Sequence, residues 1–203
     1  QVVSTGYVPR AHQAYVHVNK KRFNVLSCHR RFGKTHLSAN EMIHCGLQNE
    51  LANPQYAYIA PTYGQAKRVA WDVFKGYLKN IPGVEFNESE LRADIARPSR
   101  RDRVRIMLLG AENPGALRGL YLDGVVLDEY AEMNPEVWSM VIRPALSDRL
   151  GWAIFIGTPR GQNHFYEIYR QAEGKPDWFR AIFKASETKI IPLAELEAAA
   201  AIM

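Results

Sequence analysis

The segment from residue 23 to residue 35, FNVLSCHRRFGKT, constrains the fold more than any other stretch of the chain. It begins with a short apolar run that predicts a buried strand, and the helical apolar spacing of Leu37–Leu47 follows it. A strand, a tight loop ending in Gly33-Lys34-Thr35 and a helix are the order that a phosphate-binding P-loop requires. Backbone N–H groups at the start of the helix would surround the phosphates. Lys34 would reach the phosphate oxygens, and the Thr35 hydroxyl would ligate Mg²⁺.

The loop departs from the usual Gly-x-x-x-x-Gly-Lys-Ser/Thr pattern in two respects. Cys28 stands where the pattern has its first glycine, and the loop carries two arginines, Arg30 and Arg31. Because Gly-Lys-Thr also occurs by chance, this segment alone leaves two interpretations open. One is a phosphate-binding loop, and the other is an ordinary strand-to-helix turn with a solvated basic tip.

A second apolar run, residues 123–127 (DGVVL), ends in the acidic pair Asp128-Glu129. A buried strand that ends in two carboxylates is the Walker B arrangement, in which Asp128 holds the Mg²⁺ hydration shell and Glu129 polarises the attacking water. A buried charge is costly unless it is paired or binds a metal. A strand that simply emerges into solvent explains one acid but not the combination with Gly-Lys-Thr. The two motifs together therefore predict a nucleotide hydrolase.

Two further predicted strands lead into polar loops. Residues 55–60 (QYAYIA) precede Pro61-Thr62, and residues 152–156 (WAIFI) precede Gly157-Thr158-Pro159. Ligands bind at the carboxyl ends of parallel strands in sheets of this kind. If the second of these strands lies beside the P-loop strand, Thr158 is placed to contact the attacking water and sense the γ-phosphate.

Gln13 stands about twenty residues before Lys34, on a predicted short helix that follows Pro9 and runs through Val18. Its amide can donate and accept hydrogen bonds together, as recognition of an adenine edge requires. We expect Arg10 or Tyr7 to flank the base. The alternative is a glutamine on the surface of the helix, and the sequence does not separate the two.

The remaining segments predict helices, a hairpin and one more strand. A helical stripe that includes Val69 and Val73 predicts a helix over residues 65–78, and a second helix from Asn134 is expected to break at Arg143-Pro144. Residues 84–109 predict a β-hairpin whose return strand joins the main sheet. The other predicted elements are a loop with a short helical turn at 111–119, a helix at 163–171, a strand at 177–185 and a helix from 193 to 203.

Length and composition indicate one ordinary globular domain. The chain has 203 residues, of which 47% are hydrophobic and 23% charged, and it contains no run near the roughly 20 apolar residues of a membrane span. Its two cysteines lack metal-ligand spacing, which favours a reducing compartment. The net charge of +5 is compatible with a polyanionic partner, although clusters such as residues 97–105 are equally explained as solvated loops.

With these motifs assembled, the chain resembles the N-terminal ATPase domain of the large terminase subunit, the DNA-packaging motor of tailed bacteriophages. The resemblance rests on CHRRFGKT, YIAPTYGQA, LRGLYLDGVVLDEYAEM and IFIGTPRG. It implies an α/β P-loop NTPase of the additional-strand, catalytic-glutamate type, with the β-hairpin as an insertion. It further implies ATP hydrolysis with Mg²⁺ to drive double-stranded DNA into a procapsid, in the cytoplasm of the infected bacterial host. The implied partners are the portal or procapsid, the small terminase subunit and other copies of the chain in a ring, with a monomer in isolation.

The resemblance also assigns roles to single residues. Thr158 matches the family's coupling motif, either Arg30 or Arg31 matches an arginine inside the P-loop, and Arg118 stands where such proteins place a finger that reaches a neighbour's ATP. The alternative for Arg118 is a local salt bridge to Glu112 or Asp123. The expected catalytic residues are Lys34, Glu129, Arg118, Arg31 and Thr158, and the expected metal ligands are Thr35 and Asp128. The expected nucleotide-binding residues are Arg10, Gln13, Arg30, Arg31, Phe32, Gly33, Lys34, Thr35 and His36.

Family members usually continue into a metal-dependent nuclease domain. We therefore expect residues 1–185 to form the ATPase domain and residues 186–203 to form a helical linker towards such a domain, with no nuclease activity from these residues. Two other functions stay open. One is a helicase-like translocase, although a helicase core needs a second RecA-like domain, and the other is a nucleotide-switched assembly module that barely hydrolyses ATP.

Overall fold

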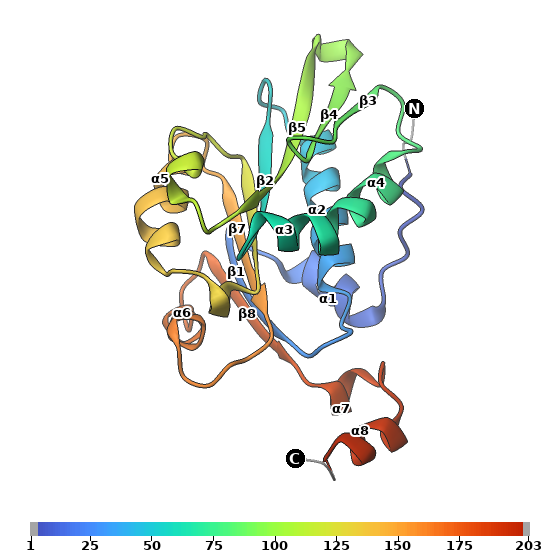
Figure 1. Ribbon diagram of the computed structural model, residues 1–203, viewed down its shortest axis with the longest axis vertical. Helices are drawn as coiled ribbons and strands as arrows, with labels where there is room; N and C mark the ends of the chain where they lie inside the picture. Colours follow the sequence, from blue (N-terminus) through green and yellow to red (C-terminus); the bar gives the residue numbers. More distant parts are fainter. Residues whose placement is uncertain (1–3, 201–203) are drawn as a thin grey trace.

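The computed structural model describes residues 4–200 and is built on an eight-stranded sheet (Figure 1). The strand order is β3-β4-β5-β2-β6-β7-β1-β8. The strands are β1 Phe23–Cys28, β2 Gln55–Ala60, β3 Val84–Asn87, β4 Arg92–Arg97, β5 Asp102–Gly110, β6 Gly124–Asp128, β7 Trp152–Gly157 and β8 Trp178–Phe183. From β5 to β8 in that order the strands pair in parallel, while β3 and β4 form an antiparallel edge. The predicted α/β fold with a mainly parallel sheet is confirmed.

Helices cover both faces of this sheet (Figure 1). Apolar side chains of α1, α2 and α4 form a core on one face, and those of α5 and α6 contribute to the core on the other face. Because both faces are covered, the parallel strands are apolar along most of their length. The helices are α1 Ala11–Asn19, α2 Lys34–Gln48, α3 Tyr63–Ala66, α4 Asp72–Leu78, α5 Arg143–Ala145, α6 His164–Gln171, α7 Ala185–Thr188 and α8 Leu193–Ala200. Within residues 4–200, no helix has the length and apolar character needed to cross a membrane.

The carboxyl ends of β1, β2, β6 and β7 meet at one edge of the sheet. Strand β7 lies between β6 and β1, pairing in parallel with both, so it is the additional strand that separates the P-loop strand from the Walker B strand. The P-loop (residues 28–35), Asp128 and Thr158 consequently leave neighbouring strands at the same edge. The expectation that Thr158 follows a strand beside the P-loop strand is confirmed.

The predicted hairpin is present but belongs to a three-stranded unit. Strands β4 and β5 pair in antiparallel fashion, and β5 also joins β2 in parallel, as expected. Strand β3, which was not predicted from the sequence, pairs with β4 at the outer edge of the sheet. Its four residues, VEFN, are exposed or half-buried, so the segment carries too short an apolar pattern to indicate a strand.

The helix predicted over residues 65–78 is interrupted by a wider turn. A π-helical turn, Lys67–Trp71, lies between α3 and α4. The π turn accommodates one more residue than an α turn, which rotates the side chains before it relative to those after it. Val69, predicted to face the core, is therefore 53% exposed, while Trp71 is buried.

The predicted break at Arg143-Pro144 is wrong. A second π-helical turn, Val137–Ile142, runs directly into α5, and Pro144 lies within the first turn of that helix. A proline is tolerated in the first turn of an α-helix because its missing N–H has no partner there. The junction between the π turn and α5 gives Pro144 such a position.

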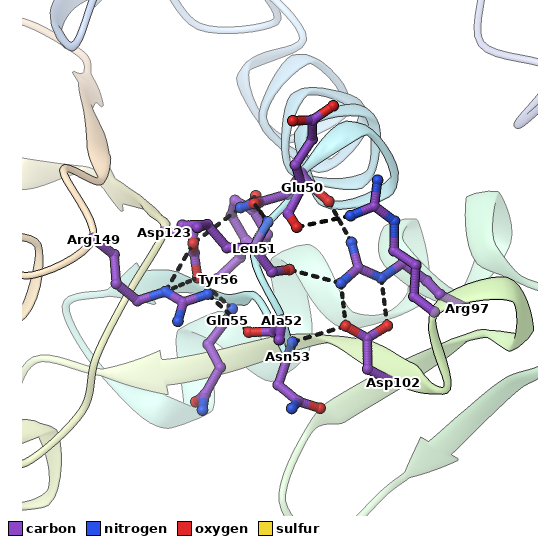
Figure 2. Close-up of polar contacts among 12 residues, drawn as sticks. Glu50, Leu51, Ala52, Asn53, Gln55, Tyr56, Arg97, Asp102, Asp123 and Arg149 are labelled. Atoms are coloured by element: carbon purple, nitrogen blue, oxygen red, sulfur yellow. Dashed lines mark hydrogen bonds and ion pairs between the residues drawn. The ribbon is translucent and has the colours of Figure 1, made fainter.

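At the opposite edge of the sheet, the loop from α2 to β2 is held by buried charges (Figure 2). Asp123, at the start of β6, accepts hydrogen bonds from the Gln55 backbone N–H at 2.9 Å and from Asn49 Nδ2 at 3.0 Å. Arg149 Nε lies 3.0 Å from the same carboxylate, and its Nη2 donates to the carbonyl of Ala52 at 2.9 Å. One buried acid thus fixes both ends of the loop.

A second ion pair holds the same loop from the hairpin side (Figure 2). The buried side chains of Arg97 and Asp102 form a bidentate pair across β4 and β5. Arg97 Nη2 also donates to the carbonyl of Leu51 at 2.8 Å, and Asp102 accepts from the backbone N–H of Asn53 at 3.0 Å. The hairpin is therefore tied to the rest of the domain through this loop.

Helix α2 is also attached to α1 through Glu41. The buried Glu41 carboxylate contacts Lys20 Nζ and His17 Nδ1, and it accepts a hydrogen bond from the thiol of Cys45. Burial opposes ionisation of Glu41, but the hydrogen bond from His17 and the charge of Lys20 outweigh it and lower the pKa of Glu41 to about 2. Ionised Glu41 therefore stabilises the packing of α1 on α2.

We expect Asp123→Ala to lower the free energy of unfolding by roughly 2–4 kcal/mol, because it leaves Arg149 and two amide groups without their acceptor. Urea denaturation followed by circular dichroism measures the effect. The matched control is Asp148→Ala, which removes an exposed carboxylate nearby and should change the midpoint little. Equal midpoints for the two variants would contradict the role given to Asp123.

Glu41→Gln should destabilise the protein in a pH-dependent way. Because the pKa of Glu41 is lower in the folded state, its contribution is present above about pH 4.5 and is lost as the pH falls towards 2. We expect the free energy of unfolding of the variant to be lower than that of the original by roughly 3 kcal/mol at pH 7. This difference should shrink as the pH falls from about 4.5 towards 2. Urea titrations from pH 7 to pH 2, with the exposed Glu50→Gln as control, measure it, and a pH-independent difference would refute it.

Candidate functional site

A cavity of about 650 Å³ opens at the carboxyl edge of the sheet. Its floor is formed by the P-loop and by the ends of β2 and β6, and its walls by the π turn, α4 and residues 6–10. Of the predicted site residues, the following line it: Arg10, Gln13, Arg31, Phe32, Gly33, Lys34, Thr35, His36, Asp128 and Glu129. The fold thus brings the P-loop and the Walker B residues together in one cavity.

The P-loop turns through two residues with left-handed backbone. Arg31 has φ 65° and Gly33 has φ 91°. Glycine is favoured at residue 33 because φ 91° strains other residues and a Cβ atom there would lie 2.7 Å from Gln13 Nε2. Helix α2 begins at Lys34, which lines the cavity. The first backbone N–H groups of a helix have no partner within it, so they would stabilise an anion at this place.

Cys28 explains why the missing first glycine is tolerated. Residue 28 is still part of β1 and pairs with Phe183 of β8, so it needs no glycine conformation. Burial raises the pKa of the Cys28 thiol, which is completely enclosed and therefore stays protonated. Cys28 is a packing residue, and the loop makes its turn further along the chain.

Phe32 packs the P-loop against the core of the domain. Its ring is buried between those of His12 on α1 and Phe183 on β8, with centroids 4.4 Å and 4.8 Å away. His29 lies in the same loop and contacts the hydroxyl of Thr188, on α7, at 2.7 Å. The loop is therefore packed against α1, β8 and α7 rather than held by solvent-exposed contacts.

Lys34 and Glu129 form an ion pair at the bottom of the cavity. Lys34 Nζ lies 3.0 Å from Glu129 Oε1 and 3.2 Å from Thr158 Oγ1. The backbone N–H of Thr158 donates to Glu129 Oε2 at 3.2 Å. Glu129 has φ 50°, a left-handed conformation that is rare for non-glycine residues and concentrates at functional sites. Three predicted catalytic residues thus contact one another, with Thr158 holding the glutamate.

Asp128 is 6% exposed and ends β6. Tyr58 O–H donates to its Oδ2, and the backbone N–H of Glu129 donates to its Oδ1 at 3.0 Å. Burial raises the pKa of Asp128 to about 6, against the hydrogen bond from Tyr58 that favours the ionised form. Within residues 4–200, Asp128 forms no ion pair with a basic side chain. Asp128 and Thr35 line the same cavity, and a carboxylate together with a hydroxyl is an oxygen donor set that suits Mg²⁺.

Gln13 connects α1 to the P-loop. It is 3% exposed, so the alternative of a helix-surface glutamine is wrong. Its Oε1 accepts from the Arg10 backbone N–H at 2.9 Å, and its Nε2 donates to the Gly33 carbonyl at 3.2 Å. Arg10 Nη1 reaches the carbonyl of Arg31 at 3.4 Å. Both residues border the cavity beside the loop, and their contact with a base stays a prediction.

The cavity has an apolar wall that was not predicted from the sequence. Val69, Val73 and Tyr77 line it from the π turn and α4, and His36 Nδ1 contacts the Tyr77 hydroxyl at 2.9 Å. The helical stripe had assigned the two valines to the core. Tyr58 was not predicted either, because nothing in the run QYAYIA separates a core tyrosine from one that touches Asp128.

The structure separates the arginines. Arg31 lines the cavity, whereas Arg30 is exposed and is not among the residues around it. Arg118 is exposed after a 3₁₀ turn, Pro114–Leu117, outside the cavity. The local salt bridge considered for Arg118 does not form among the described residues, since Glu112 accepts from the Tyr63 backbone N–H and Asp123 pairs with Arg149.

Comparison with known proteins identifies a protein family that the chain matches. The model for the family "Terminase large subunit, T4likevirus-type, N-terminal" matches residues 27–190. The large terminase subunit of Thermus virus P23-45 is 32% identical over 180 residues, which are 81% of this chain and 36% of that protein. The chain thus spans about a third of the length of that relative.

Solved structures agree with this match. The ATPase domain of the Thermus phage P74-26 large terminase has a TM-score of 0.77 at 26% identity, covering 95% of this chain and 92% of that one. The large terminase of another thermophilic bacteriophage, in complex with ADP, shares the fold with a TM-score of 0.72 at 18% identity. That match covers 88% of this chain and 44% of the ADP-bound chain.

We expect Arg31→Asn to weaken binding of a fluorescent ADP by roughly 10- to 100-fold, because a charge-assisted hydrogen bond contributes about 1.5–3 kcal/mol. Asparagine is chosen because it tolerates the left-handed backbone at this position. The matched control is Arg30→Asn, which removes the neighbouring exposed charge and should change the affinity little. A larger loss for Arg30→Asn would show that the wrong arginine has been assigned.

Proposed function

Because the chain belongs to the family of T4-type large terminase subunits, we propose that it is an ATPase domain that powers translocation of double-stranded DNA into a procapsid. The observation that carries the proposal is the convergence of Lys34, Asp128 and Glu129 on one cavity at the start of α2. A phosphate-binding loop, a buried metal-type carboxylate and a second acid beside it are the parts that phosphoryl transfer to water needs.

In the proposed reaction, the P-loop N–H groups and Lys34 bind the phosphates. Phosphate oxygens compete with Glu129 for Lys34 Nζ, so binding frees the Glu129 carboxylate from its ion pair. Glu129 then accepts a hydrogen bond from water and takes its proton as the water oxygen attacks the γ-phosphorus and the bond to ADP breaks. The Thr158 backbone N–H keeps Glu129 oriented. Mg²⁺, when held by Thr35 and Asp128, would neutralise charge on the phosphates.

Arg118 is proposed to act on a neighbouring copy. Its exposed position outside the cavity of its own chain supports this assignment, because a side chain that completes another subunit's site must reach outward. A finger of this kind adds positive charge where negative charge develops and can raise the rate by several orders of magnitude. The active form would then be a homo-oligomeric ring, and a monomer should hydrolyse ATP poorly.

The remaining proposals rest on the family alone. They are the portal or procapsid and the small terminase subunit as partners, the cytoplasm of the infected bacterial host as location, and residues 186–203 as a linker after an ATPase domain at 1–185. Absence of nuclease activity from these residues also stays a prediction.

The test uses two variants and their mixture. Glu129→Gln should keep nucleotide affinity within a few-fold and lower kcat by at least about 100-fold, because the general base is lost. The matched control is Glu132→Gln, whose carboxylate pairs with Arg160 instead of Lys34. Arg118→Ala should also be nearly inactive, and mixing it with Glu129→Gln should restore part of the activity, since each supplies what the other lacks.

Each result separates the candidate functions. Full turnover by Glu129→Gln would remove Glu129 from the mechanism. No recovery in the mixture would argue against a finger acting in trans. Tight nucleotide binding with negligible hydrolysis by the original chain at high concentration, with and without double-stranded DNA, would favour a nucleotide-switched assembly module over a motor.

A further inference from the structure

We propose that Tyr58 is a positioning residue for metal binding: its buried hydroxyl donates to Asp128, one of the two side chains expected to hold Mg²⁺, and fixes the orientation of that carboxylate. The inference rests on the proposed function, because it concerns how the same site takes up its metal–nucleotide complex.

The fold places Tyr58 at the centre of the sheet. It lies on β2 between β5 and β6, with its Cα opposite Leu108 on one side and Val126 on the other. Its ring is completely buried and packs edge-on against Phe74 of α4, with centroids 5.7 Å apart. The side chain reaches the floor of the cavity, so a rigid core residue carries a polar atom to the site.

The hydroxyl is held by site residues. Tyr58 O–H donates to Asp128 Oδ2, while the backbone N–H of Glu129 holds the other carboxylate oxygen at 3.0 Å. With one donor on each oxygen, the Asp128 carboxylate cannot rotate freely, and its remaining lone pairs are directed by its neighbours.

The Tyr58 hydroxyl also keeps its proton and so remains a hydrogen-bond donor. Burial and the charge of Asp128 raise the pKa of Tyr58 well above its ordinary value, so the phenol keeps its proton at physiological pH. A phenylalanine would fill nearly the same volume without the cost of burying a hydroxyl. The polar atom at this position is thus accounted for by its hydrogen bond to Asp128.

The chain contains its own control. Tyr56 lies two residues earlier on β2, is buried to nearly the same extent, and also has a hydrogen-bonded hydroxyl. Its partner is Asn49 Nδ2, at 2.9 Å, in the α2–β2 loop at the opposite edge of the sheet (Figure 2). Tyr56→Phe and Tyr58→Phe therefore each remove a buried hydroxyl from the same strand, one bonded to Asn49 and the other to Asp128.

The experiment measures binding of fluorescent ADP first in EDTA and then as Mg²⁺ is added. For the original chain, Mg²⁺ should tighten binding with a defined midpoint. Tyr58→Phe should raise the Mg²⁺ midpoint roughly 10- to 100-fold, the range for residues that orient metal ligands, while ADP affinity in EDTA stays unchanged. Tyr56→Phe should leave both quantities unchanged. In Asp128→Asn, adding Tyr58→Phe should have little further effect, because Tyr58 acts through Asp128.

Several results would overturn the role. An unchanged Mg²⁺ midpoint in Tyr58→Phe, or an equal shift in Tyr56→Phe, would make Tyr58 an ordinary core residue. Loss of ADP binding by Tyr58→Phe in EDTA as well would show that the hydroxyl supports the fold rather than the metal site. If the original chain binds ADP with no dependence on Mg²⁺, the proposed function fails and this role fails with it.

Discussion

The Asp128 carboxylate is buried, so the groups around it have to stabilise its charge. An ionised group at the end of a fully buried strand loses most of its hydration, and the fold surrounds it with a phenol, a backbone N–H and, further away, the charge of Lys34. These groups come from β2, from the residue after β6 and from α2. The strand order brings these groups together. It therefore also allows Asp128 to be buried in its charged form.

Helix α2 carries the P-loop at its first turn and is held at three other places. Glu41 ties its middle to α1, and Asp123 and Asp102 hold the loop that follows its last turn. Charged groups in these places are paired and buried, so they restrict where the helix lies, and removing one partner leaves the other buried without compensation. A rigid support of this kind keeps phosphate-binding groups in position without help from the ligand.

The sequence predicted the parts of the site that depend on local patterns. An apolar run followed by Gly33-Lys34-Thr35 or by Asp128-Glu129 indicates both the strand and the polar groups at its end. It could not predict the π turn, because the extra residue changes which side chains face inward without leaving a marker in the apolar spacing, and Val69 was misassigned for this reason. Nor could it reveal Tyr58, whose role depends on which strand lies beside β2.

The packing of Phe32 connects the P-loop to β8, and a contact of His29 extends this connection to α7. The Phe32 ring lies against Phe183, the last residue of β8, and His29 contacts Thr188 in the short helix that follows. Protein interiors are close-packed and hardly compressible, so a displacement of the loop must be shared by these neighbours. Under the proposed function, a movement of the P-loop would pass to β8 and α7 through a few side chains, mainly through aromatic rings rather than along the backbone.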